Sequence, residues 1–111
     1  MDVMPLTAAQ EYDLNDRHHG VRAVRLQGAG ATSAETMWIG LSHYEPGGAA
    51  EREAGTGEKI YVVIDGALTV TTDSGRVVLE RLDSCVLAAG ENRTVENHTG
   101  QAASMLVIAT S

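Results

Sequence analysis

The sequence predicts an all-β fold of antiparallel strands, and three observations support this prediction. Short runs rich in Val, Ile, Leu and Tyr occur at 21–26, 36–44, 60–64, 67–72, 76–80, 84–88, 93–97 and 103–109. Between them lie turn sequences such as EPGG, IDGA, TDSGR and AAGEN, whose Gly, Asp and Asn residues suit turns. No long segment keeps a helical period, and only 6–12 suits a short helix. Closely spaced strands of this kind are typical of a sandwich, a barrel or a jelly roll.

Length and composition indicate one domain, 1–111, that begins with an N-terminal segment, 1–20. The chain has 111 residues, of which 43% are hydrophobic and 21% charged, as in ordinary globular proteins. Its formal net charge of -7 repels a phosphate backbone, so we expect no nucleic-acid partner. Cys85 is the single cysteine, which fits a reducing compartment. Because no apolar run is long enough to span a bilayer, we expect a cytoplasmic protein with no membrane association.

The run 60–64 is apolar on both faces of the predicted strand. Tyr61 and Val63 point to one side, and Ile60, Val62 and Ile64 point to the other. A barrel wall with water outside should alternate in polarity, so its outer face needs a cover. Either the N-terminal segment or a second subunit provides it, and we expect a homodimer.

Two segments carry glycines and charged residues at regular spacings. In 47–66, Gly47 is followed after five residues by Glu53, then by Gly55, after three residues by Lys59, and after six more by Gly66. The segment 82–97 has the sequence LDSCVLAAGENRTVEN. Its spacing is set by Leu82, Ala88, Gly90, Arg93 and Asn97.

These spacings resemble the two motifs of the cupin superfamily. The first cupin motif places two His and one Glu between its glycines, and the second contains one His before its final Asn. Here Glu53, Gly55 and Lys59 stand at the three ligand positions of the first motif, and Arg93 replaces the His of the second. The resemblance implies a small single-domain cupin, a jelly-roll barrel (double-stranded β-helix), whose metal-ligand positions are substituted.

The chemistry of the substituted positions argues against a metal cofactor. Divalent metals bind imidazole, carboxylate or thiolate groups, whereas the ammonium of Lys59 and the guanidinium of Arg93 offer no lone pair. We therefore expect no metal and no other cofactor. A less favoured alternative is a non-standard site that combines the carboxylates of Glu51, Glu53 and Glu58 with His43.

If the cupin spacing directs Glu53, Lys59 and Arg93 into the barrel, their charges need partners. Glu53 neutralises one of the two cations, and the remaining positive charge favours a small anionic ligand such as a carboxylate. Tyr61 and Asn97 are the expected orienting hydrogen-bond partners. The alternative is an internal salt-bridge network that only braces the barrel.

The sequence contains no nucleophile and base at a defined spacing, so binding is the favoured function. The alternative is a cupin-like isomerase, cyclase, decarboxylase or lyase that acts on a small carboxylated substrate. Its candidate catalytic residues are His43, as a general acid or base, and Lys59, as a desolvated amine. The adjacent His18 and His19 are expected in a solvated turn.

Overall fold

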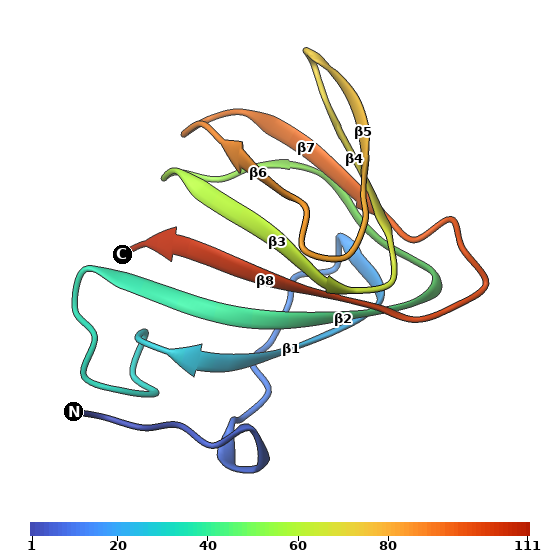
Figure 1. Cartoon of the computed structure of the whole chain (residues 1–111). Coiled ribbons are helices and arrows are strands. Elements are labelled where there is room, and N and C mark those ends of the chain that lie inside the picture. Colours follow the sequence, from blue (N-terminus) through green and yellow to red (C-terminus); the bar gives the residue numbers. More distant parts are fainter.

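The computed structural model describes residues 1–111 and contains eight antiparallel strands and one short 3₁₀ helix (Figure 1). In chain order these are η1 (Leu6–Ala8), β1 (His18–Gln27), β2 (Met37–Ala54), β3 (Lys59–Asp65), β4 (Leu68–Thr72), β5 (Gly75–Leu79), β6 (Ser84–Leu87), β7 (Asn92–Glu96) and β8 (Ala103–Thr110). The strands form one strongly curved sheet in the order β5-β4-β7-β2-β8-β3-β6, and β1 pairs with β2. The result is the predicted jelly-roll barrel, nearly closed around its core. The structure contains no helix that meets the length and hydropathy needed to cross a membrane.

Strand β2 joins the two halves of the barrel. Its first part, Met37 to Tyr44, pairs with β8, and its last part, Ala49 to Ala54, pairs with β7. The chain bends between these parts, where Gly47 has a φ of 80°. The expected EPGG turn was therefore wrong, because the strand continues through the bend and hydrogen bonds with Asn97 hold it there.

The core lies inside the barrel and follows the period of two along each strand. On β3, Tyr61 and Val63 are buried, and on β8 every second residue from Ala103 to Ala109 is buried. This confirms the predicted orientation of Tyr61 and Val63. The same alternation determines which charged side chains point into the barrel, where the candidate site lies.

The N-terminal segment does not cover the outer face of β3. Instead it runs beside β1, where Glu11 forms a β-bridge with Val24, and its predicted short helix is reduced to η1. Ile60 on the outer face of β3 is 40% exposed and lies between Val86 of β6 and Ile108 of β8. Of the two covers considered for this strand, the N-terminal segment is therefore wrong, and a second subunit stays a prediction.

Candidate functional site

A pocket of about 210 Å³ opens at one end of the barrel, and we call it the barrel pocket. The N-terminal segment crosses its mouth, and strands β1, β2, β3, β7 and β8 supply its walls. The lining residues are Tyr12, Asp13, Leu14, Asn15, His18, Trp38, Ser42, Tyr44, Glu53, Lys59, Tyr61, Arg93, Met105 and Val107. Four of the five predicted ligand-binding residues, Glu53, Lys59, Tyr61 and Arg93, therefore lie together.

Arg93 is a buried cation on the floor of this pocket. The period of two along β7 turns its side chain inward, between the outward neighbours Asn92 and Thr94, and it is 8% exposed. Its Nε donates a hydrogen bond to the hydroxyl of Tyr61 at 3.0 Å, and Nη1 donates to the main-chain oxygen of Glu51 at 2.7 Å. Both acceptors are uncharged, so the positive charge of Arg93 has no carboxylate partner.

Lys59 is a second cation in the pocket without an ionic partner. It begins β3 two residues before Tyr61, so both side chains face the interior. Its ammonium forms no ion pair within 4 Å. Burial lowers the pKa of the Lys59 ammonium, and the charge of Arg93 lowers it further, while Glu53 acts in the opposite direction.

Glu53 lies in the same pocket, but its carboxylate is bonded to the N-terminal segment and not to the two cations. It lies opposite Arg93 in the β2–β7 register, yet no ion pair joins them. Its Oε2 accepts a hydrogen bond from Asn15 Nδ2 at 2.6 Å and lies 3.8 Å from Arg17 Nε. The three charged residues therefore do not form the salt-bridge brace considered above.

His18 is a pocket residue that the sequence did not reveal. The expected solvated turn is instead the start of β1, where His18 faces the pocket and His19 points outward to Glu51. His18 Nδ1 shares a hydrogen bond of 2.9 Å with Asn15 Oδ1. Burial lowers the pKa of the His18 imidazole, and the charge of Arg93 adds to the decrease. The strand register decides this placement, and register is not readable from two adjacent histidines.

Aromatic side chains complete the wall of the barrel pocket. Burial raises the pKa of the hydroxyl groups of Tyr61 and Tyr44, so both are hydrogen-bond donors at neutral pH. Trp38 and Tyr12 lie near the mouth with their rings edge to face and centroids 6.5 Å apart. Flat apolar surfaces beside charged groups suit a small organic molecule better than a bare ion.

Asn97 and His43, two of the candidate site residues, do not line the barrel pocket. Asn97 is 1% exposed, and its amide donates to the main-chain oxygens of Tyr44 and Gln101 and accepts two hydrogen bonds from Thr99. Because these four bonds use its whole capacity, no group remains for a ligand. His43 lies on the outer face of β2, where the period of two places it opposite the inward Ser42 and Tyr44.

The side chains do not gather into a metal site. No group of three or more His, Cys, Asp or Glu side chains is close enough to hold an ion. Of the four residues in the alternative site, His43 is outside the barrel, Glu58 is exposed and Glu51 contacts His19. The barrel pocket is lined by two carboxylates, Asp13 and Glu53, and one imidazole beside two cations, and these donors do not converge on one point, which disfavours a divalent metal.

Comparison with known proteins agrees with the fold and the motif spacing. The family model for the cupin domain matches residues 40–109. The chain belongs to the cupin family. A curated relative from Mycobacterium tuberculosis, named Beta-D-galactosidase Rv1717, is 49% identical over 90 residues, which cover 81% of this chain and 78% of the relative.

Solved structures support the same fold at lower identity. The polyketide cyclase RemF from Streptomyces resistomycificus superposes with a TM-score of 0.85 at 15% identity, over 96% of this chain and 77% of that one. A cupin sugar phosphate isomerase from Silicibacter pomeroyi has a TM-score of 0.80 at 23% identity, over 97% and 74% of the two chains. A predicted oxalate decarboxylase from Thermotoga maritima has a TM-score of 0.77 at 18% identity, over 92% and 90%. These three likenesses concern the fold alone.

Proposed function

We propose that this cupin binds a small organic anion, of the carboxylate type, in the barrel pocket. The observation that carries the proposal is the pair of cations, Lys59 and Arg93, that share the pocket without a carboxylate partner. An unpaired charge removed from water costs several kcal/mol, roughly, so an anion between them gains the interaction that the protein itself does not supply. Arg93 offers a planar guanidinium that suits a carboxylate, and Lys59 adds a point charge.

The size and lining of the pocket narrow the ligand class. A volume of about 210 Å³ is smaller than the roughly 300 Å³ at which drug-sized sites begin, so the ligand is a small metabolite. The hydroxyls of Tyr61 and Ser42 and the amide of Asn15 provide hydrogen bonds beside the apolar rings. This combination suits a hydroxylated acid, such as a sugar acid, better than a purely apolar one.

Thermal unfolding with matched ligands tests the proposal. We expect D-galacturonate to bind more tightly than D-galactose by roughly tenfold or more, because only the former carries a carboxylate. Succinate and succinamide form a second matched pair. The variant Lys59→Met should lose the preference for the acid in each pair, whereas Arg52→Gln, which removes an exposed arginine paired with Asp73, should keep it. Equal stabilisation by acid and neutral partner in both pairs refutes the proposal.

Hydrolysis of β-D-galactosides is a second candidate function. The observation in its favour is the name of the relative that is 49% identical, together with Glu53 and Asp13 in the lining of the barrel pocket. Two carboxyl groups on either side of a glycosidic bond are the usual machinery of glycoside hydrolysis. Glu53 is the stronger candidate, because Asn15 and Arg17 fix its carboxylate at the pocket.

The hydrolytic candidate is tested with purified protein and 4-nitrophenyl β-D-galactoside. If it is correct, Glu53→Gln lowers kcat by roughly 100-fold or more, as expected for the loss of an acid–base group. The matched variant Glu51→Gln, whose carboxylate contacts His19 outside the barrel, keeps the activity. If the parent does not hydrolyse the substrate, or if Glu53→Gln hydrolyses it equally well, this candidate is wrong. The binding proposal is tested separately, by the matched ligand pairs.

A further inference from the structure

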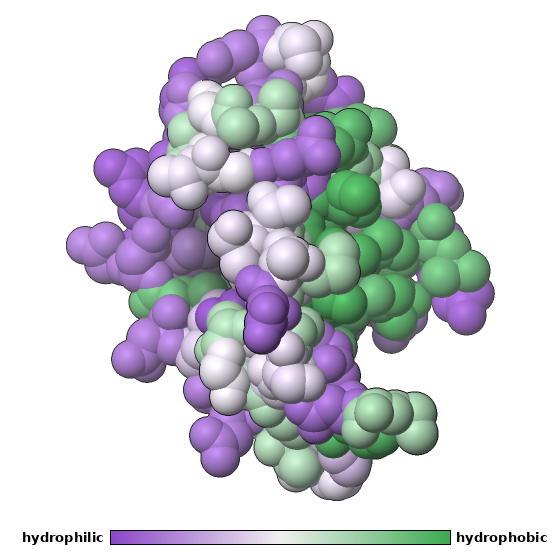
Figure 2. All heavy atoms as spheres, turned by 90° about the vertical axis from the view of Figure 1, so that its left-hand side faces the viewer, coloured by the Kyte–Doolittle hydropathy of each residue, from purple (hydrophilic) through white to green (hydrophobic).

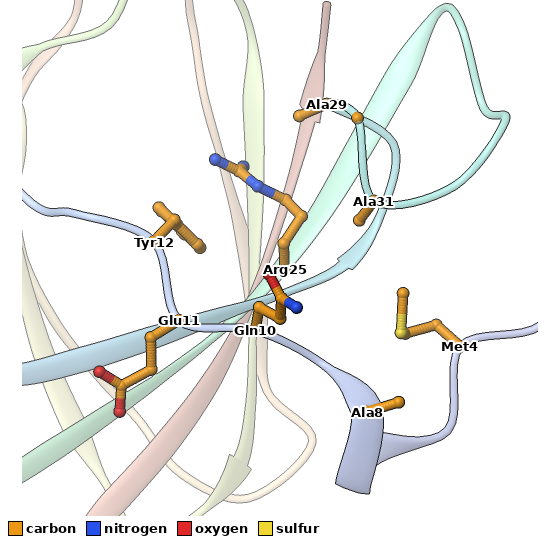
Figure 3. Close-up of a pocket in the computed structure, with 9 residues that line it drawn as sticks. Met4, Ala8, Gln10, Glu11, Tyr12, Arg25, Ala29 and Ala31 are labelled. Atoms are coloured by element: carbon orange, nitrogen blue, oxygen red, sulfur yellow. The ribbon is translucent and has the colours of Figure 1, made fainter.

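A second pocket lies on the outside of the barrel, between the N-terminal segment, β1 and the loop that follows β1. Its volume is about 430 Å³, and we call it the N-terminal groove. Figure 3 shows Met4 and Ala8 on one side of it, Ala29 and Ala31 on another, and Gln10 with the stem of Arg25 across from Met4, while the guanidinium end of Arg25 points away from Met4. Apart from Tyr12, none of its lining residues belongs to the barrel pocket.

Arg25 places a guanidinium beside this groove without using its hydrogen-bonding capacity. Its Cζ lies 3.7 Å from the ring centroid of Tyr12 and 4.5 Å from that of Trp38, so the two rings hold it by cation–π contacts. These contacts use the face of the guanidinium. No side-chain hydrogen bond or ion pair within the chain involves its N–H groups.

The backbone and one glycine fix this arrangement in place. The main-chain N–H of Arg25 donates to the oxygen of Gln10 at 3.0 Å, and that of Tyr12 donates to Ala23. A Cβ atom at Gly40 would lie 2.6 Å from the hydroxyl of Tyr12, so the absence of a side chain there makes room for the ring. The position of the Arg25 guanidinium is therefore fixed by these contacts, unlike that of a freely moving surface side chain.

The neighbouring charges indicate what kind of anion suits the groove. Glu11 is the acidic residue in the lining, but its carboxylate lies 3.8 Å from Arg22 and points away from the guanidinium of Arg25 (Figure 3). One cation suits a monoanion, whereas a phosphate would need further positive groups. Met4 and three alanines in the remaining walls offer apolar contacts for the body of the ligand, and Gln10 adds a polar group beside them.

We propose that the N-terminal groove is a binding site for a small apolar monocarboxylate, with the guanidinium of Arg25 as its anion contact. The acid accepts hydrogen bonds from the free edge of the guanidinium, and its hydrocarbon part lies against Met4, Ala8 and Ala31. This site is separate from the barrel pocket and does not depend on the function proposed for it.

The single tryptophan of the chain gives a reporter, because its ring lies beside the guanidinium of Arg25. Trp38 also lines the barrel pocket, so variants are needed to assign its response. Benzoate is titrated into the full-length protein while Trp38 fluorescence is recorded, with neutral benzamide as the matched probe. We expect a saturable change with benzoate and binding that is weaker by roughly tenfold or more with benzamide. A response to benzamide of equal affinity, or no saturable response to benzoate, overturns the proposal.

Three variants assign the response to the groove. Arg25→Gln removes the charge, and Ala31→Leu fills the groove while leaving the contacts of Arg25 intact; each should weaken benzoate binding by roughly tenfold or more. Arg22→Gln removes a cation from the opposite face of β1 and should leave the affinity within about twofold of the parent. If Ala31→Leu binds benzoate as the parent does, Arg25 only anchors the N-terminal segment and the proposal is wrong. The result for Ala31→Leu decides this even if Arg25→Gln loosens the N-terminal segment.

Discussion

Single residues give the barrel pocket its charge, and Lys59 and Arg93 are its two cations. The sequence alone predicted that Lys59, Tyr61 and Arg93 face the interior, since the cupin spacing and the strand period both require it. It did not predict His18 in the pocket or Asn97 outside it. Those placements depend on strand register and on hydrogen bonds to main-chain groups that lie far apart in sequence.

Replacing Arg93 should affect both stability and anion binding. In Arg93→Ala, the hydroxyl of Tyr61 and the main-chain oxygen of Glu51 lose their donor, which should lower the free energy of unfolding by about 1–3 kcal/mol. The stabilisation by carboxylates should also be lost. Chemical denaturation of Arg93→Ala is compared with that of Arg52→Ala, which removes the same charge from the surface. An equal loss of unfolding free energy in both variants would show that the buried hydrogen bonds of Arg93 do not stabilise the fold.

His18 should make the stability of the fold depend on pH. Because burial and Arg93 lower its pKa in the folded state, the unfolded chain binds a proton more readily below about pH 6.5. The contribution of neutral His18 is therefore complete above that pH and is lost as the pH falls toward the lowered pKa. Denaturation curves from pH 7.5 to 5 should show a smaller decrease for His18→Gln than for the parent. His19→Gln, at an exposed position, is the control.

At the scale of the elements, the strands were predicted correctly from the sequence, and one turn was not. Seven of the eight expected strands correspond to observed strands within a few residues, because their apolar alternation survives in the sheet. The exception is β2, which continues through the predicted EPGG turn. The glycines of that segment are as compatible with a bend within a strand as with a turn between two strands. Only the pairing of the later residues with β7 shows that the strand continues.

The turn between β3 and β4 gives a test of this element-level account. Gly66 has a φ of 74°, and a Cβ there would lie 2.7 Å from the main-chain oxygen of Ala102. Gly90 has a similar φ of 78° but no atom within 4 Å of such a Cβ. Both Ala variants meet the same backbone strain, so Gly66→Ala should be less stable than Gly90→Ala by about 1–3 kcal/mol, the cost of the clash. Thermal or urea unfolding measures the difference, and equal stabilities would show that the turn relaxes freely.

At the scale of the whole molecule, the outer face of the sheet is apolar across β2, β8, β3 and β6. The register brings its side chains into one continuous surface, made of Ile39, Leu41, Leu106, Ile108, Ile60, Val62 and Val86. Figure 2 shows hydrophobic residues gathered along one side of the molecule. None of these side chains is charged, so no like charges repel a second copy of the chain, and we infer that two copies pair through this surface about a two-fold axis.

A homodimer through this face is therefore expected, and one substitution should dissociate it. Val86→Glu places a charge within the apolar surface and should give a monomer in sedimentation at micromolar concentration. Val78→Glu changes a valine of similar exposure, 56% against 59%, on β5, which is not one of the four strands of this face, and should leave the dimer intact. A parent protein that sediments as a monomer, or two variants that behave alike, would refute this assembly.

We infer that this cupin barrel encloses the unpaired positive charges of Lys59 and Arg93 and not a metal ion. The most direct measurement is a crystal structure of the protein grown with D-galacturonate at neutral pH. We expect the carboxylate in the barrel pocket, within hydrogen-bonding distance of Arg93 or Lys59. A metal ion held by Glu53 and His18 in that pocket, or an acid found only elsewhere on the molecule, would contradict the account.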